Sequence, residues 1–351
     1  MSVSIQHFDC LSDGRSVDKV ILTNGHGTSV SVLTLGASLQ SFCFGGKDIV
    51  LGFDRAEEYL HSGAYIGATV GRVCNRTCDG RFVLNGQEYT LACNEEERRV
   101  HLHGGLVGFD KKIWEPTILS DATDPQVCFS ASSADGEEGY PGNLLLCVSY
   151  TLTEQNALIL EYAVRTDADT PVNLTNHTYF NLNGCDGKTV HNTFLQINAE
   201  EYTPVTERLI PTGEFAGVAD TALDFRSEKL IGDALDHEDD TMRYTGGVDH
   251  NFVLSRQRDH LKEAAVAYSP DTSIRLHCFT DLPGLQVYTG NFLDEQGGKY
   301  GLKWGKHQGF CLETQFFPNS INQLNFPSIV LKAGETFRST TVYSVSSDRE
   351  E

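Results

Sequence analysis

The sequence predicts an all-β protein that folds as a large sandwich with little helix. Short runs of alternating apolar and polar residues recur along the whole chain, and turn residues separate them. The 33 glycines suit a fold rich in turns. No helical period persists for more than a few turns, and no linker divides the chain. Because sandwiches often exceed the usual length of a domain, we expect residues 1–351 to form one domain.

The first predicted elements lie in the N-terminal quarter of the chain. Residues 17–25 are typical of a strand followed by a turn, and residues 28–35 and 38–44 continue the alternation. A single short helix is expected over residues 54–60. Residues 82–91 predict a hairpin, because the pair Asn85-Gly86 is a strong two-residue turn signal.

The remaining strands are predicted at regular intervals to the end of the chain. Each is a run rich in apolar and β-branched residues with turn residues on both sides. They cover residues 127–131, 144–152, 158–164, 194–198, 251–254, 264–268, 274–279, 284–292, 310–317, 328–331 and 339–344.

The charge and the apolar content exclude several partners. The net charge of -21 argues against nucleic acid and against anionic membrane surfaces, and it disfavours strongly anionic substrates. The chain begins without a visible signal peptide, and no segment approaches the roughly 18 apolar residues of a membrane span. We therefore expect a cytoplasmic protein, as a monomer or a weak dimer.

The ten cysteines are scattered and contain no CxxC pair. Cys74 and Cys78 are four positions apart but have no matching second half, so no zinc site is expected. Reduced and mostly buried thiols fit a cytosolic protein best.

Residues 173–182 carry an unusual row of polar side chains. If this segment is a strand, alternate side chains share one face. A cleft that binds a polyhydroxylated ligand would use such a face, and the histidine at its centre can donate or accept a proton near neutral pH. Taken alone, a histidine in this setting is more often a structural residue bonded to its neighbours. The row consists of Asn173, Thr175, His177, Tyr179 and Asn181.

Glu313 stands in the middle of a strongly apolar predicted strand. Alternation places it on one face with Cys311, Gln315 and Phe317, opposite an apolar face. A carboxylate in such a strand is seldom buried without a partner, and partial desolvation would make it a better general base. The alternative is a glutamate on an edge strand that faces water.

Several other polar residues are weaker candidates. Asp249 shares a face with Asn251, whereas His250 falls on the apolar face and is expected in the core. Gln286 shares its face with Tyr288. Asn75 and Arg76 supply hydrogen-bond donors, and His103 precedes Gly104-Gly105, where the backbone can approach another group closely.

Other chemistries lack their motifs. The sequence contains no phosphate-binding glycine loop followed by Lys-Ser/Thr, no HExxH and no GxSxG. His101 and His103 form an HxH pair without obvious further ligands, so a metal site is not favoured. The carboxylates are scattered, and nothing singles out two of them as a glycosidase pair.

Seven motifs nevertheless occur in the order found in aldose 1-epimerases, also called galactose mutarotases, and the chain resembles that family from about residue 14 to residue 343. The motifs are Gly71-Arg-Val-Cys-Asn-Arg, Leu102-His-Gly-Gly-Leu-Val-Gly-Phe-Asp with Trp114, Asn176-His-Thr-Tyr-Phe-Asn-Leu, Ile210-Pro-Thr-Gly-Glu, Val248-Asp-His-Asn-Phe, Leu285-Gln-Val-Tyr-Thr-Gly-Asn and Glu313-Thr-Gln-Phe-Phe-Pro.

The resemblance implies a β-supersandwich that interconverts the α and β anomers of free hexoses such as galactose and glucose, without a metal or a cofactor. It implies that Glu313 is the general base for the anomeric hydroxyl and that His177 is the general acid for the ring oxygen. We expect these two groups to face each other across one sugar ring, and Tyr179 or Phe317 to contact its apolar face. The remaining implied sugar-binding residues are Arg76, His103, Asp249 and Gln286, with Asn75 assisting.

Two alternatives stay open. The first is a non-catalytic sugar-binding or regulatory module on the same fold. The second is a mutarotase for hexose 6-phosphates, which would need a cluster of cations. The charged segment 94–101 and the acidic insert 236–240 depart from the family pattern and leave the preferred sugar open. The local cations are Arg98, Arg99, Lys111 and Lys112.

Overall fold

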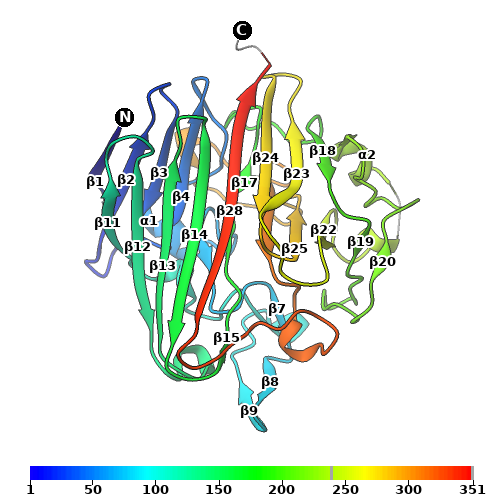
Figure 1. Cartoon of the computed structure of the whole chain (residues 1–351). Coiled ribbons are helices and arrows are strands. Elements are labelled where there is room, and N and C mark those ends of the chain that lie inside the picture. The colour runs from blue at the N-terminus through cyan, green and yellow to red at the C-terminus, as the bar shows by residue number, and fades with distance from the viewer. Residues whose placement is uncertain (238–239, 349–351) are drawn as a thin grey trace.

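The computed structural model describes residues 1–237 and 240–348. Its largest element is an antiparallel nine-stranded sheet that combines strands from both halves of the chain (Figure 1). The C-terminal strand β28 lies between β14 and β24 and so joins the two halves. In spatial order the strands are β11 (Glu115–Ser120), β12 (Gln126–Ser133), β13 (Leu144–Leu152), β14 (Ala157–Thr166), β28 (Thr336–Ser347), β24 (Ile274–Thr280), β23 (Lys262–Tyr268), β18 (Phe194–Ile197) and β21 (Lys229–Leu230).

Two smaller sheets pack against the large one. The first is a five-stranded meander of β1 (Ser2–Cys10), β2 (Ser16–Thr23), β3 (Ser29–Leu33), β4 (Ser38–Phe44) and β5 (Lys47–Asp48). The second has six strands in the order β17 (Tyr179–Phe180), β26 (Phe310–Gln315), β25 (Gly284–Tyr288), β22 (Asp249–Val253), β19 (Glu201–Tyr202) and β20 (Ala216–Gly217).

Short elements connect the sheets. Four two-stranded pairs are β6 (Thr69–Val70) with β16 (Thr175–Asn176), β7 (Arg76–Cys78) with β10 (Val100–Leu102), β8 (Arg81–Leu84) with β9 (Gln87–Thr90), and β15 (Thr170–Pro171) with β27 (Val330–Leu331). The α-helices are α1 (Ala56–His61) and α2 (Ile231–Leu235), and the 3₁₀ turns are η1 (Glu96–Arg98), η2 (Phe109–Lys111), η3 (Glu137–Gly139), η4 (Asp240–Met242), η5 (Lys299–Gly301) and η6 (Ser320–Asn322). Within the described residues, no helix has the length and apolar character needed to span a bilayer.

One apolar core fills the space between the three sheets. Alternate residues of the nine-stranded sheet, such as Leu146 and Leu160, are buried against Val30 of the five-stranded sheet and Val287 and Leu312 of the six-stranded sheet. This layered arrangement of antiparallel sheets confirms the predicted all-β sandwich with little helix. The expected short helix and the hairpin at Asn85-Gly86 are also present, as α1 and as β8–β9.

Residues 173–182 do not form the single strand that alternation predicted. The segment is broken into β16, which pairs with β6, and β17, which pairs with β26 of the six-stranded sheet. Alternation assumes a continuous strand, and here the chain leaves one sheet before it joins the next. His177 lies at this break, where its N–H donates to the carbonyl of Ala68 and its carbonyl accepts from the N–H of Gly67.

The polar row in this segment therefore does not share one face of a cleft. The amide of Asn173 donates to the carbonyl of Phe316, and that of Asn181 donates to the carbonyl of Gln308, so both satisfy buried backbone groups. Of the five polar residues, only His177 and Tyr179 line the cavity described below.

The prediction of reduced, mostly buried cysteines is wrong for part of the set. Cys128 and Cys147 form a disulfide with an S–S distance of 2.10 Å. The register of β12 and β13 pairs Ser130 with Cys147, so the two cysteines are diagonal neighbours, which sequence separation cannot reveal. Among the cysteines with free thiols only Cys74, Cys278 and Cys311 are buried. The strand β1 was not predicted from the sequence. Positions 238–239 of the acidic insert lie outside the described residues.

Candidate active site

A cavity of about 340 Å³ lies against the inner strands β26, β25 and β22 of the six-stranded sheet and collects most of the predicted site residues. Six of the seven line it, although they come from distant parts of the chain: Asn75, Arg76, His103, His177, Asp249 and Glu313. The seventh, Gln286, is 4% exposed and is not among the lining residues.

Three neighbouring strands hold the acidic side of the cavity. Glu313 on β26 is the register partner of Gln286 on β25, and Asp249 on β22 is the partner of Tyr288 on β25. Because side chains alternate along each strand, Phe310 and Leu312 point into the core while Glu313 points into the cavity. The predicted alternation of this strand is confirmed, and the glutamate is not a solvent-facing edge residue, since it is only 2% exposed.

The opposite wall is formed by the pairing of β7 with β10. The backbone N–H of Asn75 donates to Nδ1 of His103 over 3.2 Å, and the N–H of His103 donates to the carbonyl of Asn75 over 3.0 Å. At the next residue, Gly104, the backbone approaches the chain at Gly71 so closely that a Cβ atom would lie 1.8 Å from the carbonyl oxygen of Gly71. The close backbone approach predicted at this glycine is confirmed.

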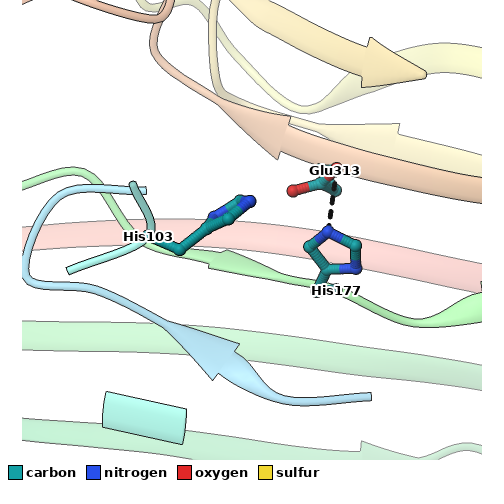
Figure 2. A group of neighbouring side chains, drawn as sticks. All are labelled: His103, His177 and Glu313. Atoms are coloured by element: carbon teal, nitrogen blue, oxygen red, sulfur yellow. Dashed lines mark ion pairs between the residues drawn. The ribbon is translucent and has the colours of Figure 1, made fainter. Parts of the chain in front are cut away.

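His177 and Glu313 lie side by side in the buried part of the cavity (Figure 2). Nε2 of His177 is 3.6 Å from Oε1 of Glu313, and the two side chains are 6% and 2% exposed. The thiol of Cys311 contacts Nδ1 of His177 at 3.6 Å and so holds the other edge of the ring. Figure 2 also shows the ring of His103 pointing toward the pair, with a distance of 5.1 Å between the two histidine ring centroids.

Burial sets the direction of both pKa shifts in this pair. It lowers the pKa of His177 to about 4, because the imidazolium loses its hydration. It raises the pKa of Glu313 well above its ordinary value, the negative charge of Asp249 adds to the effect, and Arg76 opposes it. Both shifts favour the neutral form of each group, so burial favours a proton on the carboxyl group beside a neutral imidazole.

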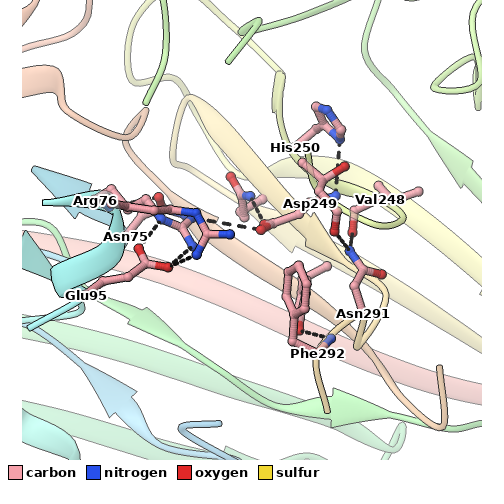
Figure 3. A network of polar contacts seen from close by, with 12 residues as sticks. Asn75, Arg76, Glu95, Val248, Asp249, His250, Asn291 and Phe292 are labelled. Carbon is pink, nitrogen blue, oxygen red and sulfur yellow. Dashed lines mark hydrogen bonds and ion pairs between the residues drawn. The ribbon is translucent and has the colours of Figure 1, made fainter. Parts of the chain in front are cut away.

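Arg76 is the centre of a second, charged group at the rim (Figure 3). Its Nε donates to Oε2 of Glu95 over 2.8 Å, and its Nη1 lies 3.9 Å from Oδ2 of Asp249. Gln286 donates from Nε2 to Oδ1 of Asp249 over 2.6 Å, so it orients that carboxylate rather than lining the cavity. Glu95 also accepts a hydrogen bond from Arg98. The sequence marked the segment 94–101 as unusual, but nothing in it linked Glu95 to Arg76.

The cavity also contains aromatic residues that sequence reasoning largely missed. Tyr65 lies with its ring centroid 4.6 Å from that of His103, and Tyr179 lies 5.1 Å from His177. Tyr288 and Phe292 complete this lining. The expectation for Tyr179 agrees with its position, but Phe317 packs in a separate apolar cluster because the strand ends before it.

His103, His177 and Glu313 have potential ligand atoms within 4.8 Å of one another, which raises the question of a metal ion. Nδ1 of His103 accepts a backbone N–H, so the neutral ring carries its proton on Nε2, the nitrogen left to face the cavity. An N–H group cannot ligate a metal, so this donor set does not suit one. The other member of the predicted HxH pair, His101, is bonded to the carbonyl of Ala92 and the hydroxyl of Tyr140.

Comparison with known proteins finds related sequences and structures. The family described as Aldose 1-epimerase matches residues 18–344. Galactose mutarotase from Sus scrofa is 45% identical over 303 residues, which cover 86% of this chain and 85% of that protein. Aldose 1-epimerase from Escherichia coli K12 is 37% identical over 338 residues, which cover 94% and 96%. The crystal structure of galactose 1-epimerase from Lactobacillus acidophilus NCFM has a TM-score of 0.87 at 30% identity and covers 99% of both chains.

The chain therefore belongs to the aldose 1-epimerase family. This confirms the family predicted from the seven motifs. The protein is therefore an isomerase that interconverts the anomers of hexoses.

Proposed function

We propose that the cavity is where a free hexose such as galactose or glucose changes its anomer, with Glu313 as general base and His177 as general acid. The observation that carries this proposal is the 3.6 Å separation of Nε2 and Oε1 inside one buried cavity. The anomeric oxygen and the ring oxygen of a hexose are bonded to the same carbon. Groups that serve these two oxygens must lie side by side, so the expectation that they face each other across the ring is wrong.

The pair needs one proton for the reaction, and burial leaves it with one. A sugar in the cavity supplies hydrogen-bond partners to both groups. Its anomeric hydroxyl donates to Glu313 and favours the carboxylate, while its ring oxygen accepts from His177 and favours the imidazolium. The same proton then lies on His177, and the pair is in the form that opens the ring.

The steps balance without a covalent intermediate. Glu313 takes the proton of the anomeric hydroxyl, the bond between C1 and the ring oxygen breaks, and His177 gives its proton to that oxygen. The product is an open-chain aldehyde, and rotation about the C1–C2 bond presents its other face. His177 then takes the proton back as the ring closes, and Glu313 returns its proton to the new anomeric oxygen.

The other lining residues hold the sugar in place for these transfers. Arg76 offers N–H donors, His103 offers an Nε2–H donor that its tautomer fixes, and Asp249 offers acceptors for hydroxyl groups. Asn75 lies next to both and supports the ring of His103. Gln286, which the family resemblance assigned to the sugar, acts in this proposal through Asp249.

Polarimetry tests the proposal directly. Freshly dissolved α-D-galactose and α-D-glucose should reach equilibrium faster with the protein than in buffer alone, in proportion to protein concentration. A rate no faster than buffer for several hexoses would support the alternative of a non-catalytic sugar-binding module, especially if calorimetry still detected binding of the same sugars.

The pH dependence of this rate is a further prediction. The pair keeps its single proton above the lowered pKa of His177 and below the raised pKa of Glu313. We expect kcat/KM to stay level through pH 6.5, where an ordinary histidine titrates, and to fall only toward about pH 4 and again above the pKa of Glu313. Polarimetry at each pH, with the spontaneous rate subtracted, measures this; a half-loss near pH 6.5 would contradict it.

A further inference from the structure

The ionisable lining of the cavity is acidic apart from one arginine. Among the described lining residues Arg76 is the cationic side chain that stays charged at neutral pH, and it lies among several carboxylates. Both histidines have pKa values lowered by burial and so add no positive charge. The acidic residues are Glu95, Asp249, Asp294, Glu295 and Glu313, and burial disfavours the charged form of Glu313.

Glu95 occupies the donors of two arginines at once. Its Oε2 accepts from Nε of Arg76 over 2.8 Å, and its Oε1 accepts from Nη2 of the same residue over 3.4 Å, which makes a bidentate pair. Oε1 also accepts from Nη1 of Arg98. The side chains of Arg76, Glu95 and Arg98 are 11%, 17% and 27% exposed, so solvent screens this group only partly.

An arginine fork is the protein group best matched to carboxylates and phosphates. Arg76 has one edge on Glu95 and its remaining Nη1 within 3.9 Å of Asp249, so a carboxylate already faces each side of it. Arg98 is held by Glu95, and its guanidinium lies 6.0 Å from the ring centroid of Phe292 at the cavity rim. A sugar that carries its own negative charge finds no unoccupied fork here.

The cations that a hexose 6-phosphate would need are not at the cavity. Lys111 and Lys112 line a different groove, and the side chain of Arg99 is 79% exposed, 4.0 Å from Asp79. Of the four cations that the sequence offered for a phosphate, Arg98 alone lies near the rim, and its charge is paired with that of Glu95. Glu95, a residue of the unusual charged segment, thus pairs with both cations near the cavity.

We propose that Glu95 determines specificity by excluding anionic sugars, because its carboxylate occupies the forks of Arg76 and Arg98 in their place. The inference rests on the proposed active site and adds a repulsive element to it, which is a common means of discrimination. Neutral hexoses are unaffected by the charge and use the positioned Arg76 as a hydrogen-bond donor. Glu95 does not transfer a proton and is a positioning residue in this scheme.

The test compares Glu95→Gln with wild type and with Glu97→Gln, which removes an exposed carboxylate from the same turn. Equilibrated D-galacturonate and D-glucose 6-phosphate serve as inhibitors of galactose turnover, so only their occupancy matters. In Glu95→Gln both inhibition constants should fall by on the order of tenfold relative to the KM for galactose, because two guanidinium groups lose their partner. In Glu97→Gln they should stay at the wild-type values.

Two further arms make the result specific. The double variant Glu95→Gln with Arg98→Gln should lose part of the gain, and raised ionic strength should weaken it, since the attraction acts between charges that solvent partly reaches. The milder Glu95→Asp, which keeps the charge on a shorter side chain, should give a smaller shift in the same direction and is available if the glutamine variant unfolds.

Unchanged inhibition constants in a folded Glu95→Gln that still turns over galactose would overturn the inference and leave the proposed function intact. Loss of galactose turnover in wild type would instead overturn the proposed function. In that case calorimetric binding of galacturonate to the same variants still decides the role of Glu95, with tighter binding expected in Glu95→Gln and no change counting against it.

Discussion

Replacing Glu313 with glutamine is expected to lower kcat by about 10²- to 10⁴-fold, the usual contribution of one proton-transfer group. The amide keeps the size of the carboxyl group and its place on β26 beside His177. It cannot take the proton of the anomeric hydroxyl, so the ring does not open. Sugar binding should survive within a few-fold, because Arg76, His103 and Asp249 are unchanged. Polarimetry measures the first quantity and calorimetry with galactose the second.

A glutamate–histidine pair elsewhere in the chain is a matched control. Oε1 of Glu263 lies 2.7 Å from Nδ1 of His277, on β23 and β24 and outside the cavity. Glu263→Gln should retain wild-type kcat. The Glu313→Gln protein should unfold close to the wild-type temperature, since a neutral amide of the same size replaces a carboxyl group whose neutral form burial already favours. If it kept most of its rate while folded, Glu313 would not be the base.

Replacing His177 with glutamine is expected to cause a loss of the same order, about 10²- to 10⁴-fold in kcat. The amide nitrogen can occupy the region of Nε2 and donate a hydrogen bond to the ring oxygen. It cannot release a proton and take it back as the ring opens and closes. The KM for galactose should change much less than kcat, and polarimetry across a range of sugar concentrations separates the two.

The double variant examines whether the two residues work as a unit. When one proton circulates between two groups, the loss of either stops the cycle, so their effects are far from additive. Combining His177→Gln with Glu313→Gln should leave a rate close to that of either single variant. His277→Gln is the control for the loss of a histidine. A double variant whose loss equals the product of the two single losses would mean that the groups act independently.

The course of the strands was largely predictable from local pattern. The alternation in residues 144–152 and 158–164 corresponds to β13 and β14, because one face of each strand must enter the core and the other must not. The same reasoning worked for Glu313, since a continuous strand has only two faces. It failed for residues 173–182, where the chain leaves one sheet and joins another and the period of two no longer applies.

Contacts between distant segments could not be predicted in the same way. Gln286 was assigned to the sugar from a motif, and only the structure shows that its amide donates to Asp249, two residues along β22 from its register partner Asn251. Glu95 was noticed only as an unusual charge, and its partner Arg76 is 19 residues away on a separate strand. The disulfide between Cys128 and Cys147 likewise depends on strand register.

The sequence by itself determined the all-β class, the family and the set of polar residues from which the site is made, because these follow from local alternation and from ordered motifs. Only the tertiary structure decided that His177 and Glu313 lie 3.6 Å apart and side by side, in a cavity whose burial moves both pKa values. Distance and desolvation arise from packing between segments more than 130 residues apart. The alternation of any one strand carries no information about either.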